Sequence, residues 1–587
     1  MILHTRLRTA RLGQNKRNHA MQPDNPSTIV HLFQSAANRG AKRAALHLPV
    51  ADGASFQSLN WIDLSQEVRR LAAGLCRAGV QPGDRVAQIS ENRYEWILLD
   101  LAVHLARGVH VAIHSVLSGQ QIAFQIADSG ARIVVLSTTA QADKLVKALA
   151  SGALLSNDLQ FYCYDSTEVE IGGQPVQPFT ELFAATGRDA ADAIEKEALN
   201  QTKPGELATI LYTSGTTGEG KGVMLSHGNL VSNAKASCAA FENTADDVRL
   251  CWLPLSHVFA RTADLYTWLV RASQLALAES REKIIAHCGV LHPTLMNGVP
   301  FFFEKVARGL IDAGKLGPVE PGGQTYLQRL LGEKMRACCS GGAALPDHVA
   351  KLFWQEGVPL VQGYGLTESS PVISTCTPDR FKLGSVGPAV ENVEIKITDD
   401  GEILTRGPHV MLGYWNRPAE TAAAIEGSWL RTGDLGFLDA DGYLFITGRK
   451  KELIVTAGGK NIAPLAVESL LVKEPLIYQA IVIGEGRRFL TALIVPNPDA
   501  LRAEIIARKI PVPSAAEALV NPEVLKLYRE RIDSRLANLS ECEQIQRFAL
   551  LPRAFDAEHE EVTPTLKLRR AVIHDHFAGE IQSLYSE

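Results

Sequence analysis

Apolar residues near the start of the chain recur at the spacing of a helix that buries one face. The apolar positions of this stretch are Trp61, Ile62, Leu64, Val68, Leu71, Leu75 and Cys76. A period of three to four residues predicts an amphipathic helix. A polar turn at residues 81–84 then leads into Arg85 to Ser90, which has the pattern of a strand.

The same alternation continues toward the middle of the chain. Trp96 to Leu105 and Gln141 to Leu149 have helical periodicity, and three runs are strand-like: His110 to Ile113, Arg132 to Leu136 and Leu207 to Tyr212. Helices that alternate with buried strands indicate parallel sheets with helices on their faces. We therefore expect an α/β fold whose large N-terminal domain contains mainly parallel sheets.

The pattern changes downstream of Arg380. Short strand-like runs at Val393 to Ile397, Glu402 to Arg406 and Tyr443 to Thr447 are separated by Gly, Asp and Pro. This spacing predicts a small β-rich subdomain.

The last part of the chain, from Lys450 onward, has apolar segments of its own. Ala480 to Ile483 and Phe489 to Val495 are separated by polar stretches, and the whole region is long enough to form an independent domain. We expect a small α+β domain at the C-terminus.

Composition narrows the class of protein. The chain has 587 residues, beyond the roughly 250 to 300 residues at which one core stops growing. Its formal net charge of -5 provides no basic field for nucleic acid, so no nucleic-acid partner is expected. The nine cysteines are scattered without CxxC pairs, which favours a reducing cytoplasm. No apolar run reaches the roughly 18 to 20 residues that span a bilayer.

Residues 1–20 differ from the rest because they contain five basic residues and no acid. We predict a disordered basic extension, and Met21 begins a more ordinary sequence. A transit-like or lipid-touching segment is the alternative, which leaves open a peripheral contact at the inner membrane face.

The segment richest in chemistry is Leu211 to Asn229, LYTSGTTGEGKGVMLSHGN. A strand-like run enters a loop of glycines and hydroxyl residues that ends near Lys221. Glycines let backbone N–H groups approach an anion, hydroxyls add donors, and the lysine supplies a positive charge. This combination is suited to a polyphosphate.

Two other interpretations of this loop are weaker. Gly215 to Lys221 reads GxxxxGK, but Gly222 stands where a P-loop has the Ser or Thr that binds magnesium. A flexible linker without a ligand would not need so many hydroxyls and a lysine.

The loop closely resembles the phosphate-loop signature of the adenylate-forming, or AMP-binding, superfamily. This superfamily contains acyl-CoA synthetases, the adenylation domains of peptide synthetases and firefly luciferase. The resemblance implies that the nucleotide is bound here by Thr213, Ser214, Gly215, Thr216, Thr217, Gly218 and Lys221.

Gln362 to Pro371, QGYGLTESSP, looks like the second nucleotide motif of the superfamily. The resemblance implies that Tyr364 stacks on adenine, that Thr367 meets the α-phosphate, and that Glu368 holds Mg²⁺ together with the hydroxyl of Thr213. Oxygen ligands suit a hard divalent cation. The nucleotide-binding residues of this motif are Gln362, Gly363, Tyr364, Gly365 and Thr367.

Two shorter motifs are similar to the nucleoside-binding parts of the superfamily. SGGAAL implies an adenine-pocket turn at Gly341, Gly342 and Ala343, in which a side chain at either glycine would meet the base. WLRTGDLG contains Asp434, whose two acceptor oxygens suit the vicinal ribose hydroxyls.

Gly448 to Pro464, GRKKELIVTAGGKNIAP, resembles the superfamily's hinge and the glycine loop after it. Arg449 would contact the ribose or phosphate, and Lys451 falls at the hinge position. Three residues would border the tunnel for the pantetheine arm of CoA: Gly458, Gly459 and Lys460.

Near the C-terminus, TPTLKLRR places Lys567 at the position of the superfamily's catalytic lysine. The common form has Gly before this lysine, whereas this chain has Leu566, a variant that resembles long-chain members. LPLSHVFAR and NGVPFFFEKVARGL also look most like the long-chain fatty acid branch. This implies an acyl pocket near His257 and Phe259, with core packing as the alternative role for both residues.

Together these motifs imply a fatty acid:CoA ligase. A medium or long-chain fatty acid would be activated by ATP to an acyl-adenylate with release of pyrophosphate, and then transferred to CoA. Catalysis is expected to be mainly electrostatic, with Lys567, Thr213, Lys221 and Glu368 as the catalytic residues and Mg²⁺ as the metal. The domains would be residues 21–448, a hinge at 449–451, and a mobile domain at 452–587.

Two other functions stay open. A ligase that delivers to a carrier protein would need that carrier in trans, because no carrier-domain signature follows Lys567. A non-catalytic nucleotide-binding regulator is the alternative from another class. The sequence does not decide between a monomer and a homodimer.

Overall fold

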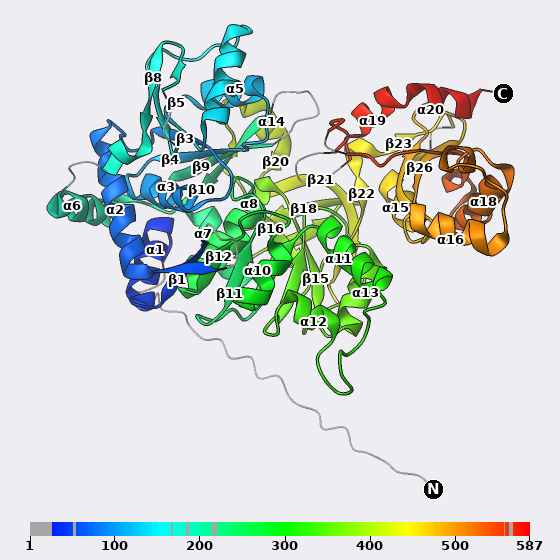
Figure 1. Ribbon diagram of the computed structural model, residues 1–587. Coiled ribbons are helices and arrows are strands. Elements are labelled where there is room, and N and C mark those ends of the chain that lie inside the picture. Colours follow the sequence, from blue (N-terminus) through cyan, green and yellow to red (C-terminus); the bar gives the residue numbers. More distant parts are fainter. Residues whose placement is uncertain are drawn as a thin grey trace.

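The computed structural model describes most of the chain. The described residues are 26–50, 55–165, 168–183, 187–213, 220–458, 460–556, 558–562 and 568–586. Two large sheets with their helices form the main body, and the residues from β23 onward form a separate lobe beside it (Figure 1).

The first large sheet has nine strands in the order β19-β10-β9-β4-β3-β5-β6-β8-β7. Its inner strands pair in parallel, whereas β10 pairs antiparallel to both β9 and β19. The strands are β3 (Arg85–Ile89), β4 (Val109–Ile113), β5 (Ala131–Leu136), β6 (Gln160–Cys163), β7 (Glu170–Ile171), β8 (Gln174–Pro178), β9 (Leu207–Thr213), β10 (Lys221–Ser226) and β19 (Gly413–Tyr414).

The second large sheet has eight strands in the order β16-β15-β14-β13-β11-β12-β1-β2. Only its two outer pairs, β15 with β16 and β1 with β2, are antiparallel. The strands are β1 (Ala44–Pro49), β2 (Phe56–Asn60), β11 (Val248–Cys251), β12 (Gln274–Leu277), β13 (Leu295–Gly298), β14 (Ala337–Ser340), β15 (Leu360–Gly365) and β16 (Val372–Thr375).

Helices fill the space between the two sheets and cover their outer faces. The inner layer shares one apolar core with both sheets and consists of α1 (Ile29–Gly40), α2 (Trp61–Arg77), α3 (Tyr94–Leu105), α7 (His227–Ala240) and α9 (Thr267–Arg271). The outer helices of the first sheet are α4 (Gly119–Ser129) and α5 (Thr139–Ala150), and α6 (Arg188–Gln201) packs on α2. The outer helices of the second sheet are α10 (Ile284–Leu291), α11 (Pro300–Asp312), α12 (Tyr326–Leu331) and α13 (Asp347–Gln355).

Local sequence explains where the inner helices begin. The side chain of Asn60 caps α2 by accepting a hydrogen bond from the Asp63 backbone N–H at 2.9 Å. Ser226 and Asn229 form a capping box at the start of α7. α3 is buried on all sides because it lies between two sheets, so its sequence is apolar nearly throughout.

A π-helical segment interrupts the helix that follows β11. α8 (Val258–Ala260) continues as η2 (Arg261–Tyr266), in which the hydrogen bonds have π spacing, and then as α9. π segments are rare and are frequent at functional sites. This segment lies beside the cavity described below.

The third sheet forms a small antiparallel subdomain. Its strands are β17 (Glu394–Ile397), β18 (Glu402–Arg406), β20 (Ile425–Glu426), β21 (Trp429–Leu438) and β22 (Leu444–Arg449), and α14 (Pro418–Ala424) precedes β20. A short helical turn, η4 (Lys450–Glu452), then leads into β23 (Ile454–Val455).

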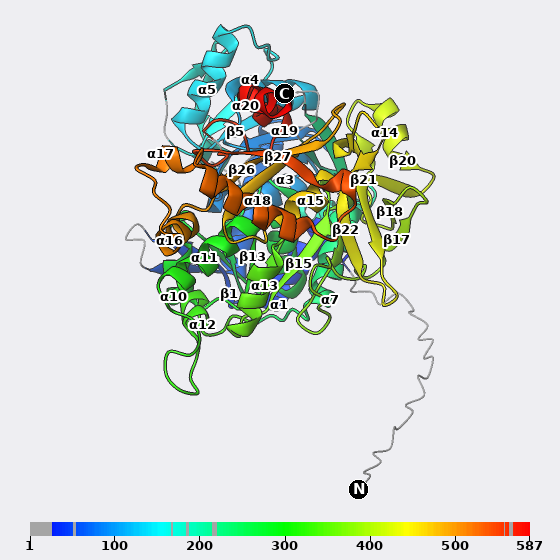
Figure 2. The same cartoon turned by 90° about the vertical axis from the view of Figure 1, so that its right-hand side faces the viewer.

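The C-terminal lobe has its own cores, separate from those of the large sheets. In Figure 2 it faces the viewer, with the sheets behind it. Its strands are β23, β24 (Asn461–Ile462), β25 (Ile477–Ile483), β26 (Leu490–Pro496) and β27 (Ile545–Leu550), and its helices are α15 (Pro464–Leu471), α16 (Pro498–Arg508), α17 (Ala515–Ala518), α18 (Pro522–Leu536), α19 (Arg570–His576) and α20 (Ala578–Tyr585). It touches the main body through the packing of α15 against β22, the ion pair of Lys473 with Asp347 at 3.1 Å and the contact of Arg308 with the Tyr478 ring.

The predicted α/β class is confirmed, as are the expected strands and helices in their order. Of the described helices, none combines the length and apolarity that crossing a bilayer requires. The predicted basic extension, residues 1–20, lies outside the described residues.

Candidate functional site

A cavity of about 1050 Å³ opens at the carboxyl ends of the parallel strands. Ligand sites of open α/β sheets are found at this edge. Most of the predicted site residues line it, namely Thr213, Lys221, His257, Phe259, Gly341, Gly342, Gly363, Tyr364, Gly365, Thr367, Glu368, Arg449 and Lys451. Motifs that are far apart in the sequence therefore meet around one space.

One end of the cavity brings a cation, a carboxylate and hydroxyls together. Thr213 at the end of β9 pairs with Lys221 at the start of β10. The Lys221 Nζ atom lies 5.1 Å from the centre of the Tyr414 ring, a cation–π contact. The Tyr414 hydroxyl donates a hydrogen bond of 2.9 Å to Oε1 of Glu368. Burial and the Glu368 carboxylate raise the pKa of Tyr414, so this phenol stays a donor.

The donor set around Glu368 fits a divalent cation bound to phosphate. Its Oε1 atom accepts from one neutral hydroxyl, and no ion pair to Glu368 is found within the described part of the chain. The carboxylate faces the cavity together with Thr213. Oxygen atoms of this kind are the ligands that Mg²⁺ prefers.

The nucleoside end is organised around Asp434, which is buried behind the cavity wall. The Tyr364 hydroxyl donates to Oδ2 of Asp434 at 2.7 Å, and Nε of Arg449 donates to Oδ1 at 2.7 Å. Burial alone would lower the pKa of Arg449, but the Asp434 carboxylate more than offsets this and raises it. Because each carboxylate oxygen can accept a second bond, Asp434 retains acceptor positions for a diol.

The glycines of these motifs are required by the protein's own packing. A Cβ at Gly341 would lie 2.9 Å from the ring of Phe259, and a Cβ at Gly365 would lie 1.7 Å from the backbone oxygen of Pro371. Gly342 has a φ of +83° and open space around it, so its backbone conformation is the reason for glycine there.

Besides Asp434, two described residues of these motifs lie outside the cavity lining. Gln362 accepts from the Leu345 backbone N–H at 3.2 Å and donates to the Ser385 carbonyl at 3.0 Å. It therefore holds the Gly341 turn from behind. Ala343 is exposed on that turn.

The other end of the cavity lies along the face of the eight-stranded sheet. His257 caps α8 by accepting from the Phe259 backbone N–H at 3.2 Å, and both side chains line the cavity. The His257 ring is tilted against the ring of His114, whose Nδ1 bonds to the Ser256 hydroxyl at 2.7 Å. Burial lowers the pKa of His114 to about 4, so it is neutral at physiological pH.

Behind these residues a buried charged network joins the π segment to the first sheet. The guanidinium of Arg261 pairs with Asp100 of α3 and donates to the Thr209 hydroxyl of β9 at 2.7 Å. Its Nη2 atom also lies 2.8 Å from Nδ1 of His110 in β4. Arg261, Asp100 and His110 are fully buried. The network ties this end of the cavity to the strand that ends at Thr213.

The predicted hinge and tunnel residues follow β22. Lys451 lies in η4 and lines the cavity, and its neighbour Lys450 is paired with Asp400 at 2.7 Å. Gly458 and Lys460 are exposed and do not line the cavity in this conformation.

Seven predicted residues lie outside the described part of the chain: Ser214, Gly215, Thr216, Thr217, Gly218, Gly459 and Lys567. Their roles therefore stay predictions. The described residues on either side of 563–567 form a bridge between Val562 and Leu568.

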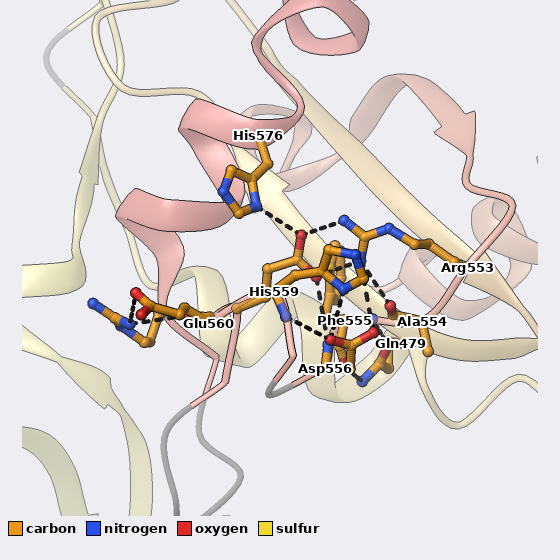
Figure 3. Close-up of polar contacts among 10 residues, drawn as sticks. Gln479, Arg553, Ala554, Phe555, Asp556, His559, Glu560 and His576 are labelled. Atoms are coloured by element: carbon orange, nitrogen blue, oxygen red, sulfur yellow. Dashed lines mark hydrogen bonds and ion pairs between the residues drawn. The ribbon is translucent and has the colours of Figure 1, made fainter. Parts of the chain in front are cut away.

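Near this bridge, Asp556, His559 and Glu561 have the composition of a metal site (Figure 3). The buried Glu561 is already bound through both oxygens to Arg553, at 2.6 Å each, and to Nδ1 of His576 at 3.0 Å. A guanidinium on the carboxylate opposes a second cation there. The cluster instead holds together the segments before and after residues 563–567.

Comparison with known proteins decides the family. The model described as "AMP-binding enzyme" matches residues 32–415, and the model "AMP-binding enzyme C-terminal domain" matches residues 451–587. The chain belongs to the AMP-binding enzyme family. The family is the one that the phosphate-loop and later motifs predicted.

Relatives of this AMP-binding enzyme carry related names. The chain is 32% identical over 571 residues to the long-chain-fatty-acid–CoA ligase FadD15 of Mycobacterium bovis. The match covers 90% of this chain and 93% of that protein. The chain is 27% identical to the human long-chain-fatty-acid–CoA ligase ACSBG1, covering 96% of this chain and 86% of that one.

Solved structures share the fold of this AMP-binding enzyme. The ATP-bound MatB of Rhodopseudomonas palustris has a TM-score of 0.72 at 24% identity, covering 93% of this chain and 99% of that one. The anthranilate CoA ligase AuaEII in complex with anthranoyl-AMP has a TM-score of 0.73 at 19% identity, covering 95% and 99%.

The cavity of this AMP-binding enzyme contains functional candidates that sequence analysis missed. Tyr414, which holds Glu368, comes from a two-residue strand too short for a periodic pattern. Arg249 interrupts the otherwise apolar β11, and a charged residue inside a buried strand was the signal that could have identified it. His114 had no sequence signal beyond its place after β4.

Proposed function

We propose that this AMP-binding enzyme activates a medium or long-chain fatty acid with ATP and transfers the acyl group to CoA. One observation carries the proposal. A single cavity joins a phosphate-binding end, with Lys221 and Glu368, to a channel along the sheet that reaches Leu295 and Ala337. The names of the relatives, long-chain-fatty-acid–CoA ligases, support the same substrate class.

In the first half-reaction an anionic carboxylate must approach the α-phosphorus of ATP. The barrier is largely electrostatic, so fixed positive charges and donors lower it most. Lys221 and Thr213 line the phosphate end, and Thr367 lies beside them on η3 (Thr367–Ser369). We assign to Lys567 the role of bridging the carboxylate and the α-phosphate, a role supported by the motif that contains it.

The proposal includes Mg²⁺, held by Glu368 and the Thr213 hydroxyl. When bound, this ion would neutralise charge on the phosphates that leave. Tyr414 orients Glu368 for this purpose by its hydrogen bond. Tyr364, Asp434 and Arg449 would hold the adenine and ribose at the adjoining end.

In the second half-reaction the CoA thiol attacks the acyl-adenylate and AMP leaves. We propose that residues 452–587 rotate about Lys451 between the two steps, because Gly458 and Lys460 lie away from the cavity in the conformation described. The lobe has cores of its own, separate from those of the large sheets, which supports such a rotation.

The proposal also includes transient contact with a membrane surface, because the substrate partitions into lipid. Cosedimentation with anionic vesicles tests this part. CoA, rather than a carrier protein, is the proposed acceptor.

The decisive experiment measures ATP-dependent pyrophosphate release with acids from acetate to oleate, with and without CoA, and detects thioester in parallel. Release and thioester that peak with long acids, and that collapse in Lys567→Ala, are the expected result. Release without thioester would point to a carrier protein, and no release with any acid would contradict the proposal.

A further inference from the structure

The deep end of the cavity contains a buried arginine. Arg249 in β11 is 5% exposed and lines the cavity. Its guanidinium lies 3.6 Å from Oδ1 of Asp264, a distance too long for a hydrogen bond. No hydrogen bond to this guanidinium is found among the residues that the structure describes.

Two further buried polar atoms lack hydrogen-bond partners in the described part of the chain. The hydroxyl of Ser237, in the cavity wall, and Oδ2 of Asp264 are both buried without a hydrogen bond. Oδ1 of Asp264 accepts from Nδ2 of Asn297 at 2.7 Å. Arg249, Ser237 and Asn297 line the cavity, whereas Asp264 is buried behind Arg249 and Asn297, outside the lining.

Unsatisfied buried polar groups are rare in native proteins and are costly. An acyl chain made only of methylene groups would fill this end of the cavity and leave the guanidinium and the Ser237 hydroxyl without hydrogen-bond partners. A ligand atom that accepts hydrogen bonds would satisfy them. The cluster therefore favours a substrate that carries oxygen within its chain.

The charge of the cluster indicates which oxygen-containing group of a substrate could bind there. Burial raises the pKa of Asp264 to about 6, so at neutral pH Asp264 is ionised and balances Arg249. A second carboxylate on the substrate would add an unpaired charge to a buried site. A hydroxyl is uncharged and can accept a hydrogen bond from Arg249.

The sheet register places this cluster beyond the reacting end of the channel. Asn297 pairs with Cys339 and Arg249 is level with Leu295 and Ala337. The Arg249 level is therefore two residues, or about 7 Å, deeper than the Asn297 level. The oxygen would lie on the distal part of the acyl chain.

We infer that Arg249, paired with Asp264 behind it and sharing the cavity wall with Ser237, forms a binding site for a hydroxyl group on the distal part of the acyl chain. The enzyme would then prefer hydroxy fatty acids of matching length over unsubstituted ones. This inference rests on the proposed function, because it assumes that the channel holds the acyl group.

The test compares pairs of acids within each enzyme variant. A series of ω-hydroxy acids of increasing length is measured beside the unsubstituted acids of the same lengths, with thioester formation as readout. For the wild type we expect a higher kcat/KM for the hydroxy acid at one length. In Arg249→Met this preference should fall by about ten- to a hundredfold, as for loss of a hydrogen bond to a charged group.

The controls separate a specific loss from misfolding and from failure of the proposed function. The preference is a ratio within one variant, so the amount of active enzyme cancels. Arg336→Met removes an arginine that pairs with Asp247 at 2.9 Å outside the cavity, and it should leave the ratio unchanged. Ser237→Ala should lower the ratio less than Arg249→Met does.

Three outcomes would overturn the inference while leaving the ligase function standing. These are an equal ratio in wild type and Arg249→Met, a wild-type preference for unsubstituted acids at every length, and a wild-type preference for α,ω-dicarboxylic acids over hydroxy acids. Absence of thioester from every acid would instead contradict the proposed function.

Discussion

Glu368 is positioned by one neutral donor, the hydroxyl of Tyr414. The ring of Tyr414 also lies beneath Lys221, so this side chain contacts both the proposed metal ligand and the phosphate-loop lysine. Tyr414 therefore acts on the reaction through its neighbours. Replacing it with phenylalanine removes only the hydroxyl and should not leave a large cavity.

Tyr414→Phe should therefore lower kcat/KM for pyrophosphate release about tenfold or more, because a hydrogen bond to a charged group is lost. The Mg²⁺ concentration that gives half-maximal rate should rise. Tyr326→Phe is a matched control, because Lys315 lies over this ring outside the cavity. An unchanged Mg²⁺ dependence in Tyr414→Phe would show that the hydroxyl does not position Glu368.

Asp434 gives a second prediction at this scale. Asp434→Asn removes the charge that Arg449 pairs with and replaces one of the two oxygens that we propose as acceptors for the ribose. KM for ATP should rise about tenfold or more, with a smaller effect on KM for the acid. Asp439→Asn breaks the pair with Lys382 in the same subdomain and should leave KM for ATP unchanged.

Single residues also show where sequence reasoning reached its limit. The motif identified Gly341 and explained it by the adenine, but the structure gives a second reason, because a Cβ on this residue would lie 2.9 Å from the ring of Phe259. The sequence predicted both residues without relating them. Their contact depends on where α8 packs against the end of β14, which no local pattern encodes.

At the scale of elements, the transition from β22 to η4 connects the main body to the lobe. Lys451→Pro should restrict the backbone at this point and stop the proposed rotation. Pyrophosphate release should persist while thioester formation is lost. Lys451→Ala, which keeps the backbone free, should retain both steps, and equal loss of both steps in Lys451→Pro would contradict the hinge.

The cluster of Glu561, Arg553 and His576 gives a second prediction at the scale of elements (Figure 3). Glu561 accepts from Arg553 and His576, and its backbone oxygen accepts from the Arg569 N–H at 2.7 Å. It thereby fixes both ends of the segment that contains Lys567. Glu561→Gln should lower pyrophosphate release about tenfold or more, because a buried charge pair is broken.

The control for Glu561→Gln uses a different starting compound. Transfer of the acyl group from synthetic acyl-adenylate to CoA should be retained, because that step does not use Lys567. His559→Gln alters an exposed neighbour and should affect neither step. Equal loss of both steps in Glu561→Gln would indicate a general effect on the lobe.

The helices and strands themselves were predicted better than the pairing between strands. The pattern of apolar residues predicted α2, α3 and α5 and the strands β3, β4, β5, β9, β17, β18 and β22, because apolar residues mark the buried faces of these elements. The pairing of β19 with β10 could not be predicted, since the two strands are distant in sequence and β19 has only two residues. The phosphate end of the site depends on that pairing, which explains why Tyr414 was missed.

For the whole molecule, buried histidines make stability depend on pH. Burial lowers the pKa of His110, His114 and His409 to about 4, whereas an unfolded histidine has a pKa of about 6.5. Between these values only the unfolded chain gains the protons. Stability is therefore fully present above pH of about 6.5 and is lost as the pH falls toward 4. Asp264, whose pKa is raised, opposes this loss in part below pH of about 6.

The melting temperature should fall as the pH is lowered through this window. Each histidine lowers the free energy of unfolding by about 1.4 kcal/mol for each pH unit. His409→Gln removes one titrating group outside the cavity and should make the fall less steep. Melting curves of both proteins across the window test this, and identical pH dependence would contradict the role of His409.

The buried pairing of Arg261 with Asp100 has a consequence for inheritance and for protein engineering. The two partners come from α3 and from the π segment, far apart in the sequence, yet each would be an isolated charge without the other. Exchange of the helical segment 258–271 with a relative that lacks this pair should therefore succeed only when both positions are transferred together. In this part of the enzyme, an exchange between relatives has to include both members of a charge pair that lie in two distant stretches of the chain, rather than one contiguous segment.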